Sequence, residues 1–102
     1  MRGLLLRRAF YERPTLTVYR RPGCHLCDDA ELLLRDELAI RARAGLAPIT
    51  VIRVDITGDP DLQERYGRHI PVFAVAGIET ELVTTQRQVR EFLERTLPTP
   101  GA

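Results

Sequence analysis

The sequence changes its periodicity at Pro22-Gly23, and this change restricts the possible folds more than any other feature. Residues 15–19 (Thr-Leu-Thr-Val-Tyr) have high β propensity, and the Pro-Gly pair ends that run. From Cys24 onward, apolar residues recur at helical spacing, and Gly45 predicts the end of the helix. Residues 49–56 are mostly β-branched and predict a second strand, which we expect to be buried on much of both faces. A strand, a helix and a strand in this order predict a parallel pair joined by a right-handed crossover.

The second half of the chain predicts a short helix followed by a hairpin. Asp59-Pro60 is a typical helix start, and Gly67 predicts the end of that helix about two turns later. Residues 71–76 predict a strand, and Gly77 marks a turn into a weaker strand near residues 80–83. We therefore expect this strand pair to be antiparallel.

A final helix is predicted by Thr85 and Gln88, which fit a capping box. The apolar face of this helix consists of Val89, Phe92, Leu93 and Leu97. The expected order is β-α-β-α-β-β-α. The predicted fold class is α/β, with a four-stranded mixed sheet flanked by three helices, because each helix has one apolar face to bury.

The length of 102 residues indicates one domain. We divide the chain into a basic N-terminal arm (residues 1–13), a folded domain (residues 14–97) and a flexible C-terminal tail (residues 98–102). The net charge of +1 argues against a dedicated nucleic-acid-binding protein. No apolar run is long enough for a membrane helix or an export signal. We therefore expect a cytoplasmic monomer that binds neither nucleic acid nor membrane.

Cys24 and Cys27 form a Cys-x-x-Cys pair at the predicted start of the first helix. This spacing brings the two sulfur atoms within disulfide reach and directs the first thiol toward the amide groups of the helix start. Lowering a thiol pKa from ~8.5 to ~7 needs roughly 2 kcal/mol, which is the upper end of what a helix terminus supplies. We expect Arg21 and His25 to assist, whereas Asp28 and Asp29 oppose the thiolate.

The predicted helix gives the two cysteines different roles. Cys24 leads the helix and should be exposed, as a nucleophile must be. Cys27 shares the apolar stripe with Ala30 and Leu34, so it should be buried and suited to resolving a mixed disulfide. Cys-x-x-Cys within a β-α-β pattern is typical of a thioredoxin-like redox site.

Three other interpretations of the cysteines stay open at this point. A zinc site would need His25 or His69 to complete the ligand set, and we predict no metal site. An iron–sulfur cluster shared between two chains would need fewer cysteines from each. The two cysteines could also be buried residues without a chemical role.

The motif Arg-Pro-Gly-Cys-His-Leu-Cys-Asp, with a later Tyr-Gly-x-x-Ile-Pro-Val, resembles the glutaredoxin-like branch of the thioredoxin fold. The resemblance covers about residues 15–97. It implies that Pro71 is cis and lies beside Cys24, and that the Ile70 backbone is free to pair with a peptide-like substrate. It also implies that Arg21 occupies the position of a lysine that contacts a glutathione carboxylate.

The sequence differs from the glutaredoxin pattern at two places. His25-Leu26 replaces the usual Pro-Tyr, and residues 82–87 lack the Gly-Gly-x-Asp turn that helps to hold glutathione. The function implied by the resemblance is a thiol–disulfide oxidoreductase that has no bound cofactor and uses a thiol reductant, with glutathione as the candidate cosubstrate. Its expected partners are a disulfide-containing protein or a glutathione mixed disulfide. The alternatives are a metal or iron–sulfur cluster carrier and a thioredoxin-fold interaction module without turnover.

Overall fold

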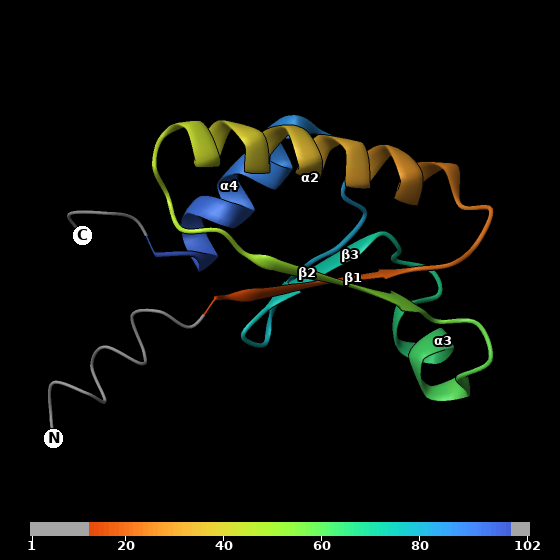
Figure 1. Cartoon of the computed structure of the whole chain (residues 1–102). Helices are drawn as coiled ribbons and strands as arrows, with labels where there is room; N and C mark the ends of the chain where they lie inside the picture. Colours follow the sequence, from red (N-terminus) through yellow and green to blue (C-terminus); the bar gives the residue numbers. More distant parts are fainter. Residues whose placement is uncertain (1–12, 99–102) are drawn as a thin grey trace, which may run out of the picture.

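The computed structural model describes residues 13–98, which form a four-stranded sheet and three helices in the predicted order (Figure 1). The predicted arm, apart from Arg13, and the predicted tail beyond Pro98 lie outside the described residues. The elements are β1 (Thr15–Arg20), α2 (His25–Arg43), β2 (Thr50–Asp55), α3 (Pro60–Tyr66), β3 (Val72–Val75), β4 (Ile78–Thr80) and α4 (Gln86–Thr96). No helix among the described residues is long and apolar enough to cross a membrane.

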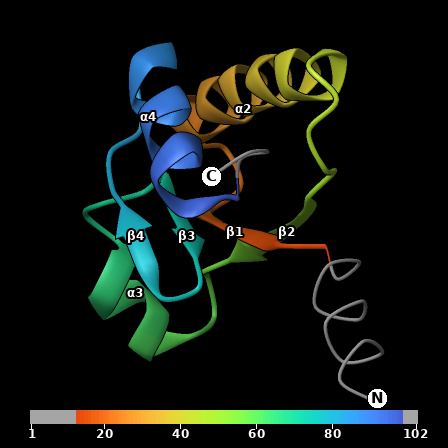
Figure 2. The same ribbon diagram turned by 90° about the vertical axis from the view of Figure 1, so that its left-hand side faces the viewer.

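The sheet has the order β2-β1-β3-β4. β1 is parallel to β2 and antiparallel to β3, and β3 is antiparallel to β4. α2 and α4 lie together on one face of the sheet, and α3 lies on the opposite face (Figure 2). This α/β arrangement confirms the predicted mixed sheet, with the parallel pair formed by β1 and β2.

The larger core lies between the sheet and the pair α2 and α4. Leu16 and Val18 of β1 and Phe73 of β3 are fully buried there, because alternate side chains of a strand point to the same face. The C-terminal helix adds Phe92 and Leu93.

Both short-range helix caps are confirmed. At the start of α3, the Asp59 carboxylate accepts hydrogen bonds from the backbone N–H groups of Asp61 (3.1 Å) and Leu62 (3.2 Å). At the start of α4, the Thr85 hydroxyl accepts from the backbone N–H of Gln88 (3.1 Å), and the Gln88 side chain accepts from the backbone N–H of Thr85 (3.1 Å). Each cap satisfies N–H groups that have no partner inside the helix.

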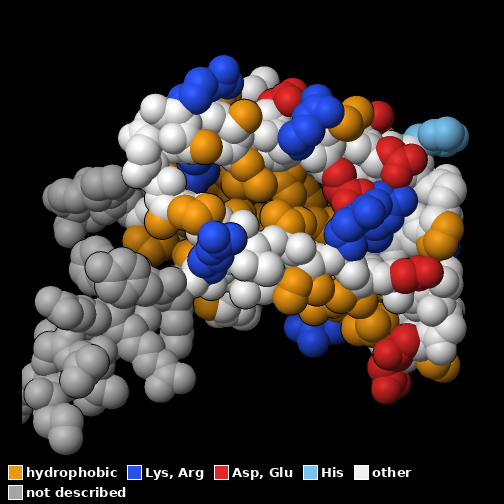
Figure 3. Space-filling model, in the orientation of Figure 1, with side chains coloured by type: hydrophobic (Ala, Val, Ile, Leu, Met, Phe, Trp, Pro, Cys, Tyr) orange, Lys and Arg blue, Asp and Glu red, His pale blue; other side chains and the backbone are white. Residues whose placement is uncertain are grey.

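The expected burial of the second strand is wrong. β2 lies at the edge of the sheet, and Val51 and Ile52 are 38% and 46% exposed. β-branched residues favour extended backbone at an edge as well as in the interior, so their presence did not establish burial. Between α2 and β2, the surface is hollowed and apolar side chains are visible (Figure 3).

The last strand begins earlier than residues 80–83. Ala76 and Gly77 both have positive φ (50° and 81°), and Val75 pairs directly with Ile78. A two-residue hairpin turn with positive φ at both positions returns the chain at once, so β4 starts at Ile78.

Candidate active site

The two cysteines lie where β1 turns into α2. Pro22 and Gly23 form the turn, and Gly23 has a φ of 76°, a conformation that glycine adopts without strain. Cys24 is the N-cap of α2, and its sulfur accepts a hydrogen bond from the backbone N–H of Cys27 (3.1 Å). The first thiol is therefore directed at the helix start, as its position in the sequence predicts.

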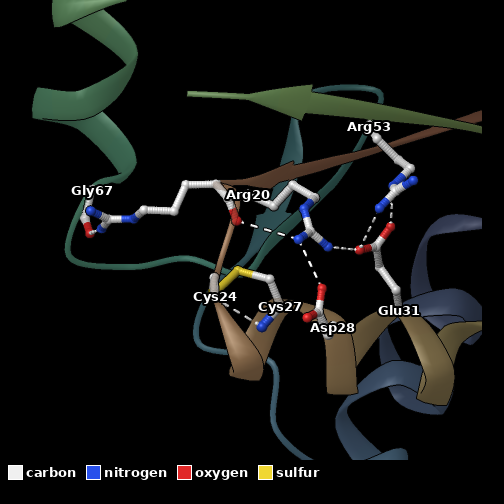
Figure 4. Close-up of a disulfide and its surroundings, with 8 residues drawn as sticks. Arg20, Cys24, Cys27, Asp28, Glu31, Arg53 and Gly67 are labelled. Carbon is white, nitrogen blue, oxygen red and sulfur yellow. Dashed lines mark hydrogen bonds and ion pairs between the residues drawn. A yellow bond between two sulfur atoms is a disulfide. The ribbon is translucent and has the colours of Figure 1, made fainter. Parts of the chain in front are cut away.

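Cys24 and Cys27 form a disulfide with a Cα–Cα distance of 5.2 Å (Figure 4). The two residues differ in exposure, because Cys24 is half-buried and Cys27 is 0% exposed. Cys27 belongs to a second, smaller core, which we call the disulfide cluster. Its buried members are Cys27, Ile56, Tyr66, Ile70 and Val72, and Tyr19, Cys24 and Leu62 pack against them.

The Ile70–Pro71 peptide bond is cis, as the resemblance implies. Both neighbours of Pro71 in the chain, Ile70 and Val72, lie in the disulfide cluster, which brings this segment and the cysteines together. The expectation of a free Ile70 backbone is wrong for its amide group, because the Ile70 N–H donates to the Tyr66 carbonyl (3.1 Å) at the end of α3. Only the Ile70 carbonyl could pair with a substrate backbone.

The other two predicted site residues are exposed. Arg21 donates a hydrogen bond to the Gly67 carbonyl (2.7 Å), which links the β1–α2 turn to the C-terminal end of α3. His25 is the first residue of α2 and lies on the surface beside Cys24. The structure thus groups Cys24, Cys27 and the cis-proline segment, while Arg21 contacts a different element.

Sequence reasoning missed a charge network beside the disulfide. Arg20, the last residue of β1, donates to Asp28 (2.8 Å) and to Glu31 of α2 (Figure 4). Glu31 also forms an ion pair with Arg53 of β2 (2.5 Å). Burial disfavours the charged form of Arg20, but its hydrogen bonds with Asp28 and Glu31 outweigh burial and raise its pKa above the ordinary value.

The position of Arg20 carried a signal for this network. It ends a strand that precedes the helix, and Asp28 and Glu31 are three residues apart on one helix face. Their pairing still depends on how α2 lies across β1, which no local pattern specifies.

A polar hollow of about 220 Å³ lies near the disulfide cluster and is lined by Arg65, Tyr66, His69, Val72, Glu79 and Glu81. The Tyr66 ring stacks on Tyr19 with a centroid separation of 4.1 Å, and its hydroxyl donates to Glu79. Burial, together with the hydrogen bond to Glu79, raises the pKa of Tyr66. The fold therefore favours the protonated phenol.

Within residues 13–98, no three His, Cys, Asp or Glu side chains come together in an arrangement that could hold a metal ion. The zinc interpretation would need Cys24, Cys27 and a histidine in one cluster. His69 instead forms an ion pair with Glu81 (3.1 Å).

Comparisons with known proteins agree with this architecture. The X-ray structure of a structural-genomics target protein from X. campestris is 33% identical, with a TM-score of 0.61, and the match covers 78% of this chain and 96% of that one. A solution structure of the same target is 32% identical, with a TM-score of 0.59 and coverages of 82% and 97%.

The germline-specific thioredoxin Deadhead from Drosophila melanogaster is 14% identical, with a TM-score of 0.56 and coverages of 93% and 91%. At this identity the similarity shows the thioredoxin fold alone. A search of curated proteins gave no significant match. The family model described as Glutaredoxin-like domain (DUF836) matches residues 15–97, which include both cysteines and the cis-proline. The chain therefore belongs to the glutaredoxin-like DUF836 family, on the thioredoxin fold.

Proposed function

We propose that this protein is a thiol–disulfide oxidoreductase in which Cys24 is the nucleophile and Cys27 is the resolving thiol. The observation that carries the proposal is the Cys24–Cys27 disulfide at the start of α2, with Cys24 half-buried and Cys27 fully buried. A nucleophile needs access to its substrate, whereas a resolving thiol needs access only to its partner.

The reaction proceeds through two exchanges. In the first, the Cys24 thiolate attacks one sulfur of a substrate disulfide, so that a mixed disulfide forms and the other substrate sulfur leaves as a thiolate that takes a proton. In the second, the deprotonated Cys27 attacks the Cys24 sulfur. This attack forms the Cys24–Cys27 disulfide and releases the second substrate thiol. The substrate disulfide is reduced to two thiols while the enzyme dithiol is oxidised, and two equivalents of an external thiol restore the dithiol.

The surroundings of Cys24 favour its thiolate form. The Cys27 N–H that donates to the Cys24 sulfur (3.1 Å) stabilises a negative charge at that atom. The N-terminal end of α2 adds the partial positive charge of the helix dipole. The exposed His25 can add a further positive charge when it is protonated.

The proposed substrate is a disulfide-containing protein or a glutathione mixed disulfide. The Ile70 carbonyl, next to the cis-proline and the disulfide, supports pairing with an N–H group of a peptide-like substrate. Arg21 supports binding of a carboxylate such as that of glutathione, because its guanidinium has five N–H donors and Gly67 takes one.

The test is to trap the mixed disulfide. A Cys27→Ser variant, reduced and mixed with glutathione disulfide or a model protein disulfide, should accumulate an adduct on Cys24 that dithiothreitol removes and mass spectrometry detects. Cys24→Ser is the matched control and should form no such adduct. The proposal fails if the Cys27→Ser variant forms no adduct with either substrate. It also fails if the purified protein is coloured by a thiolate-to-metal charge-transfer band, because that result indicates a cluster carrier.

The reduction potential of the Cys24–Cys27 pair distinguishes two kinds of oxidoreductase. A potential of about −270 mV would indicate a thioredoxin-like reductant of other proteins, whereas one at about −200 to −230 mV would indicate a glutaredoxin-like protein. Equilibration in glutathione buffers of known ratio, followed by alkylation and mass spectrometry, measures this quantity.

A further inference from the structure

Arg20 is the charged residue that connects β1 to the first turns of α2. It lies four positions before Cys24, and its side chain is 11% exposed, which is unusual for a side chain that carries a full charge. Its guanidinium donates to Asp28 (2.8 Å), to Glu31 and to the Arg21 carbonyl (3.3 Å) (Figure 4). Three acceptors on two segments thus fix one side chain next to the disulfide.

The charged side chains near the start of α2 come from several elements. They are His25, Asp28, Asp29 and Glu31 on α2; Arg20 and Arg21 at the end of β1; Arg53 and Asp55 on β2; and Arg68 and His69 in the turn after α3. Asp28 lies one helical turn from Cys24, and its backbone N–H donates to the Cys24 carbonyl (3.0 Å). An aspartate at this place competes with a thiolate for the positive end of the helix.

Arg20 removes that competition. Together with Asp28, Glu31 and Arg53 it forms an ion-paired group of two cations and two anions, which has no net charge. Asp55, opposite Arg20 on β2, is outside this group and accepts a hydrogen bond from Thr57 (2.6 Å). Without Arg20, the same group would carry one uncompensated negative charge in the first turns of α2. Like charge near an acidic group disfavours ionisation of that group.

We infer that Arg20 is a positioning residue for the nucleophile: it holds the Asp28 carboxylate in an ion pair and thereby keeps the start of α2 favourable for the Cys24 thiolate. This inference rests on the proposed function for its biological meaning. The hydrogen bonds of Arg20 reach Asp28, Glu31 and the Arg21 carbonyl and no sulfur atom, so Arg20 acts by arranging the neighbouring charges and not by contact with the nucleophile.

The test measures the acidity of Cys24 alone, in a Cys27→Ser background, by the pH dependence of its alkylation with iodoacetamide. An added Arg20→Gln change should raise the Cys24 thiol pKa by about one unit, because a nearby carboxylate loses its counter-ion. At neutral pH the alkylation rate should fall by roughly three- to tenfold, since only the thiolate reacts. Arg20→Lys, which keeps the charge but loses the planar fork, should give a smaller shift.

Two further variants separate this mechanism from a general loss of structure or charge. Adding Asp28→Asn to Arg20→Gln removes the uncompensated carboxylate and should restore the alkylation rate to within about twofold of the Cys27→Ser parent. Arg35→Gln is the matched charge control, because Arg35 lies on the same helix and pairs with the exposed Asp36 (3.2 Å). It should leave the Cys24 pKa unchanged.

The inference is overturned if Arg20→Gln leaves the alkylation profile unchanged, or if the double variant stays as slow as Arg20→Gln. It is also overturned if Arg35→Gln produces the same shift. The measurement needs no disulfide substrate. An Arg20-dependent thiol pKa combined with absence of a trapped adduct would therefore refute the proposed function and leave the positioning role intact.

Discussion

One face of the sheet is covered by α2 and α4, whereas the opposite face carries α3, the one helix there among residues 13–98 (Figures 1 and 2). The core under α2 and α4 is the larger one; its buried apolar members are Leu16, Val18, Ala30, Leu34, Phe73, Val75, Val83, Val89, Phe92, Leu93 and Leu97. Its one buried carboxylate among the described residues, Glu37 of α2, accepts hydrogen bonds from Gln86 and Arg90 of α4. The disulfide cluster on the side of α3 is smaller and contains two sulfur atoms and a phenol hydroxyl.

The difference shows how a small domain separates stability from chemistry. Apolar groups that are fully enclosed contribute to folding in proportion to the area that they bury. Reactive groups need access and polar neighbours, and the face with α3 supplies both. A hollow of about 330 Å³ there is bordered by Tyr19, Tyr66 and Glu79, among others. Substitutions on the two faces should therefore affect different measurements.

The largest expected effect is on the face with α2 and α4. Phe73→Ala should reduce the free energy of unfolding by about 3–5 kcal/mol, because the Phe73 ring is fully buried and its removal leaves a cavity in the core. Chemical denaturation monitored by circular dichroism measures this loss. The Cys24 alkylation rate of the protein that remains folded should be unchanged. A large change in that rate would mean that the two faces are not separable.

Loss of the N-cap side chain from α4 and from α3 compares the two faces of the sheet directly. Thr85→Ala removes the cap of α4 and Asp59→Ala removes the cap of α3, and each should cost about 1 kcal/mol. Only Asp59→Ala should alter the rate of thiol–disulfide exchange, because Leu62 and Tyr66 of α3 pack in the disulfide cluster. Equal effects of the two variants on that rate would contradict the distinction.

An effect of similar size is expected from Tyr66→Phe, which removes the hydrogen bond to Glu79 and keeps the stacking on Tyr19. The loss should be roughly 0.5–1.5 kcal/mol at neutral pH. The raised pKa of Tyr66 means that the fold favours the protonated phenol, so its contribution is complete below about pH 10 and declines as the pH rises toward the folded-state pKa.

The free energy of unfolding, measured between pH 8 and about pH 11, tests the direction of this pH dependence, because that interval spans the ordinary tyrosine pKa. The wild-type protein should be more stable than Tyr66→Phe at pH 8 and should lose this extra stability at the alkaline end. A difference between the two proteins that grows with pH would contradict the prediction.

The smallest effect is expected at the sheet edge. Ile52→Thr should change the free energy of unfolding by less than about 0.5 kcal/mol, since Ile52 is 46% exposed. The matched variant Val18→Thr, in the neighbouring strand and fully buried, should cost clearly more, because it buries a hydroxyl group. Denaturant titration of the pair measures the contrast between an edge strand and a central one.

The local features of the fold were predictable from the sequence, whereas features that depend on distant segments were not. Asp59, Thr85 and Gln88 act on N–H groups within four residues, so their caps could be identified without any tertiary information. The placement of the cysteines at a helix start followed from the local change in periodicity at Pro22-Gly23.

Three of the four features that the sequence did not predict have a common physical cause, which is their dependence on distant segments. The burial of β2 depends on the order of strands in the sheet, and the Arg20 network depends on how α2 crosses β1. The engaged amide of Ile70 depends on the way α3 ends at Tyr66. The early start of β4 is different, since it depends on Ala76 adopting a positive φ that its residue type does not favour.

The ion pair between Arg53 and Glu31 has a consequence for how separate molecules behave. Among the described strands, β2 pairs only with β1, and its residues Thr50–Asp55 are rich in β-branched side chains. Such an edge is a template on which a strand of another molecule can add and start aggregation. Arg53 places a charge in the middle of that edge, and a charge at this place opposes the addition. The residue that completes the charge network beside the disulfide therefore also disfavours the addition of a strand at this edge.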